Sequence, residues 1–197
     1  MPDGMAMRIG AWPSLAARLA ACTTLPSMRA ATAVLSAAGI DTLWQVCAPS
    51  PAPTDACASP LEADELAIRL AVAPGTGGTS VTRRLGFALV PADRPLAGQF
   101  ATVYRDRVDW LAGRGRVSRH TVLGWAIAHE VGHLLIGSND HTDTGLMRAS
   151  WSDLDLRRNV PDDWAFDPAL AGVLRAHLTS RVGASAHTAG PFGCGTD

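Results

Sequence analysis

A helical segment that mixes apolar residues with histidine and glutamate runs from Ser118 to Gly137. Ser118 is a common helix N-cap residue, and glycine commonly follows the end of a helix. The later part of the segment, WAIAHEVGHLLIG, is apolar except for His129, Glu130 and His133. Burying such side chains costs free energy unless they have partners. The segment therefore predicts a buried helix that bears a functional site.

The spacing of these three residues is typical of a zinc hydrolase. Residues four apart on a helix lie about 40° apart around its axis, so His129 and His133 can bind one ion. Neutral imidazoles suit zinc, and three protein ligands leave one position open for water. Glu130 lies close enough to act as general base on a metal-activated water. The H-E-x-x-H pattern thus predicts one catalytic zinc ion, with Glu130 as the catalytic residue.

The third metal ligand is expected in the chain that follows the helix. Gly137 lets the chain turn back toward the ion, and the polar loop after it reads SNDH. We expect His141 as the third ligand, because a third histidine is the commoner choice in a site of this layout. Asp140 is the alternative, since zinc also accepts carboxylates. The competing interpretation is an ordinary helix whose histidines bind no metal.

The stretch HEVGHLLIGSNDHTDTGLM, residues 129–147, resembles the active-site motif of the metzincins. This clan of zinc endopeptidases, which includes matrixins and astacins, has the pattern HExxHxxGxxH followed by a turn containing methionine. Here the pattern is HExxHxxxGxxxH, and the sequence GLM that ends at Met147 resembles the methionine turn. Within the clan, the chain is similar to small bacterial matrixin-like proteins, in which the longer spacing would define a subgroup.

The resemblance implies a zinc ion bound by His129, His133 and His141, with Glu130 as base and the methionine as a hydrophobic floor. It also implies that a peptide substrate lies antiparallel along an edge strand, which we expect at residues 99–104. The activity implied is that of a metalloendopeptidase. A catalytically weak zinc protein that binds peptides on the same fold is the alternative, against which the intact glutamate argues.

The order of helical and strand-like segments predicts an α+β fold with one mixed sheet and a small C-terminal part that ends in a helix. We expect helices at residues 25–39, 118–137 and 166–181, a helical turn at 107–112, and strands at 40–47, 66–72, 84–91 and 99–106. Ser27 and Asp167 are the expected N-caps of the first and last helices. Alternating polar residues in the strand at 99–106 are typical of an exposed edge.

The chain of 197 residues suits one domain. The metzincin-like catalytic domain is expected at residues 25–182, with a loose tail at 183–197. Residues 1–24 are either a weak signal-like region or contain a first strand at 16–22. Proline and arginine interrupt the apolar part of this region, which favours the strand.

Charge and hydropathy exclude several kinds of partner. The formal net charge is -1, which gives no reason to expect nucleic acid or an anionic membrane surface. No apolar run approaches the ~20 residues of a membrane span. We expect a monomer whose partner is a peptide or protein substrate.

Cys47 and Cys57 bracket a proline-rich loop, APSPAPTDA. A disulfide between them would close this loop, and two unpaired thiols are the alternative. Disulfides are typical of exported proteins. We therefore expect a secreted or cell-envelope protein, with the cytoplasm as the alternative.

Several residues near the motif have simpler expected roles. Gly132 inside the helix indicates close packing at that point. For Trp125 and Trp151 we expect core packing, with a place in the pocket wall as the alternative. Three histidines outside the motif are expected to face solvent: His120, His177 and His187.

Overall fold

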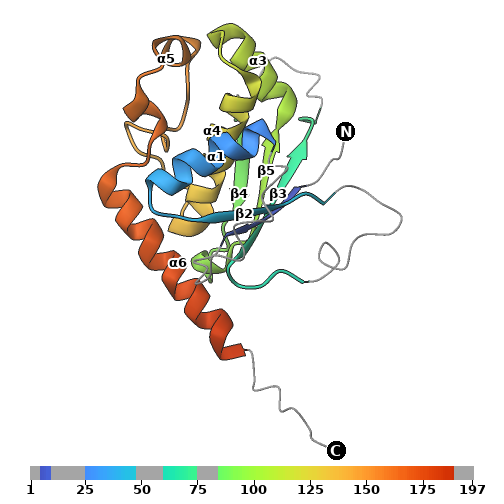
Figure 1. Cartoon of the computed structure of the whole chain (residues 1–197), viewed down its shortest axis with the longest axis vertical. Coiled ribbons are helices and arrows are strands. Elements are labelled where there is room, and N and C mark those ends of the chain that lie inside the picture. Colours follow the sequence, from blue (N-terminus) through green and yellow to red (C-terminus); the bar gives the residue numbers. More distant parts are fainter. Residues whose placement is uncertain (1–4, 10–24, 48–59, 75–83, 189–197) are drawn as a thin grey trace, which may run out of the picture.

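The fold is α+β, as predicted, and consists of one mixed sheet and helices that pack against it (Figure 1). The computed structural model describes residues 5–9, 25–47, 60–74 and 84–188. The elements are β1 (Met5–Ile9), α1 (Pro26–Ala37), β2 (Thr42–Gln45), β3 (Glu65–Ala71), β4 (Gly86–Leu89), η2 (Pro95–Ala97), β5 (Phe100–Tyr104), α3 (Arg105–Gly115), α4 (Arg119–Ile136), α5 (Asp153–Arg158), η3 (Pro161–Trp164) and α6 (Pro168–Thr188).

The sheet has five strands in the order β2-β1-β3-β5-β4. β3 and β5 are parallel, and the other neighbouring pairs are antiparallel. β5 therefore lies inside the sheet, and the prediction of an edge strand at residues 99–104 is wrong. Helices cover one face of β5, while Phe100 on the other face is exposed. Buried and exposed residues therefore alternate along this interior strand, as they would along an edge strand. The edge strand at this end of the sheet is β4.

Helices α1 and α4 pack tightly against each other (Figure 1). A Cβ atom at Gly124 of α4 would lie 2.5 Å from the Cβ atom of Ala30 and 2.7 Å from the carbonyl oxygen of Ser27. The predicted N-cap at Ser27 is wrong, because Leu25 is the N-cap and Pro26 opens the helix. Ser27 is buried in the first turn.

Several element boundaries differ from those predicted. The first strand is β1, and the segment 16–22 lies outside the described residues. The turn predicted at 107–112 is the full helix α3, and α5 was not predicted. α6 continues to Thr188, so the loose tail predicted from residue 183 is wrong up to that point, and residues 189–197 are not described.

Other predictions hold or fall outside the described residues. The Asp167 carboxylate caps α6 by accepting the amide N–H of Ala169 at 2.9 Å. Cys47 forms a disulfide, but its expected partner Cys57 lies outside the described residues, as do Cys22 and Cys194. No helix in the described part of the chain has both the length and the apolar character needed to cross a membrane.

The C-terminal helix α6 holds the end of α4 in place. The buried Arg181 guanidinium donates to the carbonyl oxygens of Ala63, Leu134 and Gly98 at 2.8, 3.3 and 2.9 Å. His177 Nδ1 donates to the carbonyl oxygen of Leu135 at 2.9 Å. His177 was expected to face solvent, but it is half-buried because it satisfies a carbonyl near the helix end.

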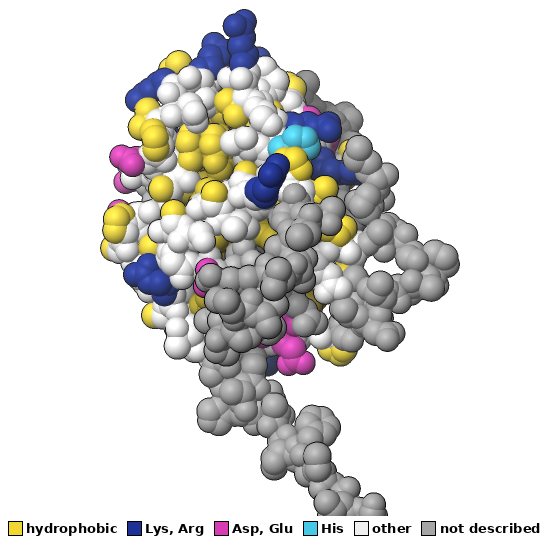
Figure 2. All heavy atoms as spheres, in the orientation of Figure 1, with side chains coloured by type: hydrophobic (Ala, Val, Ile, Leu, Met, Phe, Trp, Pro, Cys, Tyr) yellow, Lys and Arg dark blue, Asp and Glu magenta, His cyan; other side chains and the backbone are white. Residues whose placement is uncertain are grey.

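Basic side chains are prominent at the upper end of the molecule in Figure 2, where α3 and α5 lie. The exposed arginines of these two segments include Arg114, Arg116, Arg157 and Arg158. Asp153 of α5 offsets part of this charge, because it pairs with Arg114 and Arg157. This end of the molecule is therefore a surface of mixed charge.

Arg181→Met should lower the free energy of unfolding by about 2–4 kcal/mol, because it removes the donors from carbonyl groups that stay buried. Urea denaturation measures this loss. Arg175→Met is the matched control, since Arg175 is exposed and donates to the carbonyl oxygen of Ala38 at 2.8 Å. The control should lose ~1 kcal/mol or less, and equal losses in the two variants would contradict a special role for Arg181.

Candidate metal centre

Three histidine side chains converge beside the C-terminal half of α4. His129, His133 and His141 each offer one ring nitrogen, and these nitrogens lie within 4.8 Å of one another. The Nε2 atoms of His129 and His133 are 3.0 Å apart. Two nitrogens on a tetrahedral zinc ion with ~2.0–2.1 Å bonds lie ~3.3 Å apart. The histidines are therefore close enough to hold one metal ion.

Main-chain carbonyl groups fix the two helix histidines. Nδ1 of His129 donates to the carbonyl oxygen of Leu146 at 2.8 Å, and Nδ1 of His133 donates to that of Ser138 at 2.9 Å. A carbonyl oxygen only accepts hydrogen bonds, so each Nδ1 holds the proton and each Nε2 presents a lone pair. Two lone pairs that face each other repel unless a cation lies between them. The Nε2 atoms are therefore oriented as ligands of one metal ion would be.

Burial keeps these rings neutral. Burial, and after it the charge of His133, lower the pKa of His129 to about 3. Burial also lowers the pKa of His133, against the opposing effect of the Ser138 carbonyl. Only a neutral imidazole has a lone pair to donate, so the rings are in the form that binds metal.

The third histidine comes from the loop that Gly137 starts. Gly137 has a φ angle of 74°, which favours glycine, and it ends α4. The Asp140 carboxylate accepts a hydrogen bond from the Ser138 hydroxyl at 2.6 Å within this loop. Among the described residues, it is His141 and not Asp140 that lies with His129 and His133 as a possible metal ligand. The loop thus brings His141 beside the histidines of the helix.

Met147 lies beneath the helix turn that bears the histidines. A Cβ atom at Gly132 would lie 2.7 Å from Met147 Sδ and 2.8 Å from Phe166 Cε1. This contact confirms the close packing predicted at Gly132. Met147 is 1% exposed, and the amide of Thr142 donates to its carbonyl oxygen at 3.0 Å, which closes the loop.

The two tryptophans have different places. Trp125 stacks on Trp164 with ring centroids 4.0 Å apart, so it belongs to the core as expected. Trp151 meets the His129 ring edge-on at 5.6 Å and donates to the Leu146 carbonyl oxygen at 3.3 Å. Trp151 also lines the cavity described below, which was the alternative interpretation for it.

Glu130 faces the edge strand β4 from the same helix. Glu130 is 4% exposed, and its Oε2 atom has no hydrogen-bond partner among the described residues. A Cβ atom at Gly86 would lie 2.7 Å from Glu130 Oε1, so glycine there makes space for the carboxyl group. Burial raises the pKa of Glu130 to about 8, against an opposing effect of Arg84. Buried carboxyl groups without partners are typical of functional sites.

A cavity of about 550 Å³ joins the histidines and Glu130 to the surface. One wall is the first part of the edge strand with the two residues before it, and a second wall is the chain after Met147. The lining consists of residues 84–88, Ala126, His129, Glu130, His133, Asn139, His141 and residues 148–151. The first wall was not predicted from the sequence, because no local signal shows that β4 pairs with β5 and ends the sheet.

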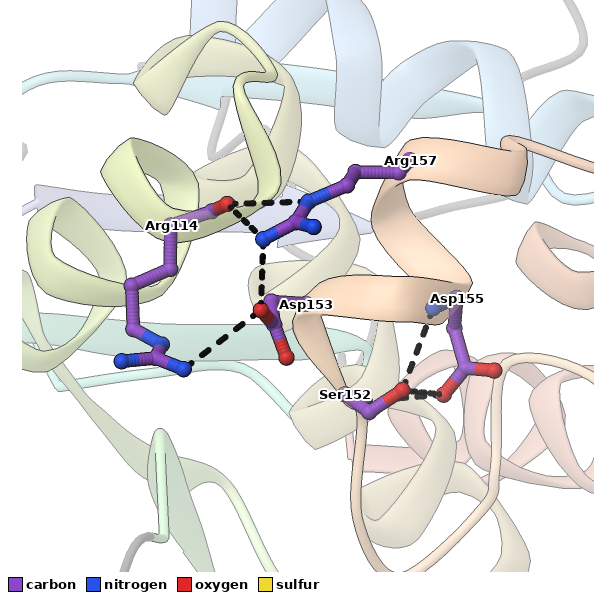
Figure 3. Close-up of polar contacts among 5 residues, drawn as sticks. All are labelled: Arg114, Ser152, Asp153, Asp155 and Arg157. Carbon is purple, nitrogen blue, oxygen red and sulfur yellow. Dashed lines mark hydrogen bonds and ion pairs between the residues drawn. The ribbon is translucent and has the colours of Figure 1, made fainter.

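Helix α5 holds the second wall (Figure 3). Ser152 caps α5, and its hydroxyl accepts the Asp155 amide N–H at 3.1 Å while the Asp155 carboxylate accepts the Ser152 amide N–H at 2.9 Å. Asp153 pairs with Arg157 at 2.7 Å and with Arg114 of α3 at 3.5 Å. These contacts fix the chain directly after the wall residues 148–151.

Comparison with protein-family models, with curated proteins and with solved structures gives no match to this chain.

The protein loaded with zinc should contain one zinc ion per chain. Alanine at His129, His133 or His141 should each reduce the zinc content, because each removes a ligand. Asp140→Ala is the matched control and should retain the ion. Zinc at ~1,000 times its dissociation constant should raise the free energy of unfolding by ~4 kcal/mol, and a chelator should reverse this. Elemental analysis and thermal unfolding measure both, and zinc loss in Asp140→Ala alone would contradict the ligand set.

Stability should depend on pH through the α5 cap. The hydrogen bonds from Ser152 lower the pKa of Asp155 below its ordinary 3.8. The charged carboxylate therefore stabilises the fold above pH ~3.8, and this contribution is lost as pH falls through the lowered pKa.

Asp155→Asn should cost ~1 kcal/mol of unfolding free energy at pH 7, and the cost should disappear in acid. Denaturation at several pH values measures it, with the exposed Asp109→Asn as control. A cost that stays constant at all pH values would disprove the role of the charge.

Proposed function

We propose that this protein is a zinc-dependent metalloendopeptidase of the metzincin type. The observation that supports this best is the combination of three convergent histidines with an unpartnered, buried glutamate on the same helix. Both face one cavity that an edge strand borders. The GLM turn, with Met147 packed under the histidine-bearing helix, agrees with the metzincin resemblance.

Each residue has a defined part in the proposed reaction. His129, His133 and His141 would hold the ion, and the carbonyl groups of Leu146 and Ser138 orient the first two rings. A zinc ion there supplies Lewis-acid chemistry, by polarising a carbonyl group and lowering the pKa of a water molecule.

The base in this proposal is Glu130. In its ionised form, the carboxylate would accept the proton of the attacking water and return it to the leaving amine. The Glu130 residue is 4% exposed, and the hydrogen bonds of His129 and His133 keep their rings in place.

The proposed substrate is an extended peptide that pairs with β4. This strand ends the sheet, and the cavity is lined by residues 84–88, which include its first residues. An edge strand offers main-chain donors and acceptors that an antiparallel peptide can use. The binding strand is thus β4, which replaces the strand expected from the sequence.

Export from the cytosol is part of the same proposal. Cys47 is disulfide-bonded, and disulfides persist in oxidising compartments such as the cell envelope or the exterior. Alkylation of the protein isolated from cells, with and without prior reduction, measures whether the bond exists there.

Glu130→Gln should lower the rate of peptide cleavage by ~10²–10⁴-fold, the typical contribution of a general base. The zinc content should stay at that of the unchanged protein, because Glu130 is not a ligand. Cleavage of casein and of a quenched peptide library, together with elemental analysis, measures both.

Two results would contradict the proposed peptidase. Equal cleavage by both forms would exclude Glu130 as the base. Zinc-loaded protein that binds peptides but never cleaves them would instead support the alternative, a catalytically weak peptide-binding protein.

A further inference from the structure

Arg84 is a cation in the cavity wall that no carboxylate neutralises within the described part of the chain. Arg148, the second arginine among the described lining residues, forms ion pairs with Asp155 at 3.7 Å and Asp163 at 3.6 Å. Among the described residues that line the cavity, Glu130 is the acidic one, and it is 4% exposed. The exposed charge of Arg84 is therefore available to a ligand.

The main chain at Arg84 has a fixed position next to the metal centre. Its carbonyl oxygen accepts a hydrogen bond from Arg107 Nη1 at 2.7 Å. The Arg107 guanidinium in turn lies over the Tyr104 ring at 4.6 Å, and the Tyr104 amide donates to Leu85 at 2.7 Å. The start of the edge strand is thus held by α3 and β5.

Arg84 is also within electrostatic reach of the reacting groups. It lines the same cavity as Glu130 of the helix and His141 of the loop. Arg84 is exposed and comes two residues before β4, where the flanking residues of a peptide along this strand would pass. Neutral side chains make up most of the remaining wall, including Asn139 and Ser150.

We propose that Arg84 selects peptides that have a carboxylate group near the bond to be cleaved, an inference that rests on the proposed function. A guanidinium binds a carboxylate through two parallel N–H donors, which gives orientation as well as affinity. The carboxylate belongs either to an Asp or Glu side chain or to the C-terminus of the peptide. A basic residue at the same place is repelled, so the site discriminates by charge.

Binding to the zinc-loaded Glu130→Gln protein tests this without requiring cleavage. Short labelled peptides that differ by Glu or Gln at one position at a time, each with a free or amidated C-terminus, separate the two sources of carboxylate. We expect the carboxylate to lower the dissociation constant of the peptide by about five-fold or more. Arg84→Ala should abolish this preference, Arg84→Lys should retain part of it, and Arg84→Glu should favour peptides with Lys at that position.

Arg94→Ala is the matched control, because it removes the same charge from an exposed side chain that lies outside the cavity lining. Zinc content and circular dichroism establish that each variant is folded. A carboxylate preference that persists in Arg84→Ala would overturn the assignment, since the carboxylate would then bind elsewhere, including on the ion. The absence of any preference, or of peptide binding, in the Glu130→Gln parent would overturn it as well.

Cleavage by the unchanged protein is measured separately. If no peptide is cleaved while the Arg84-dependent preference remains, the proposed peptidase activity fails and the binding role of Arg84 stands. If peptides are cleaved at equal rates with and without the carboxylate, the activity stands and the selectivity fails.

Discussion

Two hydrogen bonds from histidine rings to main-chain carbonyl groups determine how the rest of the site is built. They turn the Nε2 atoms of His129 and His133 toward each other and leave two lone pairs at one point. One of the carbonyl groups belongs to Leu146, so the loop after α4 must return to the helix. Met147 packs against Gly132 of α4, and Arg181 donates a hydrogen bond to the Leu134 carbonyl oxygen near the end of the helix. Both contacts help to hold the loop and the helix together.

Local signals made the helix and its site predictable from the sequence. The boundaries of α4 agree with Ser118 and Gly137, and the three predicted histidines lie together. Helix periodicity, glycine at the helix end and the four-residue spacing all act within a few turns of chain. The close contact at Gly132 was predictable for the same reason.

Non-local pairing made the edge of the sheet unpredictable. Whether β5 lies inside the sheet depends on its parallel pairing with β3, from which it is separated by a long stretch of chain. A sheet with helices on one face gives its interior strands the same alternation as its edges. Arg84 and Gly86 were missed because their roles depend on this pairing. The short helix α5 was missed because a polar, tryptophan-bearing sequence gives little periodic signal.

The proposed zinc site requires that three histidines bind one ion. X-ray absorption spectroscopy at the zinc edge of the loaded protein measures the ligands of that ion. We expect imidazole scattering from three nitrogen ligands at ~2.0–2.1 Å, with a light atom in the remaining position. Fewer than three imidazoles, or a sulfur ligand at ~2.3 Å, would contradict it.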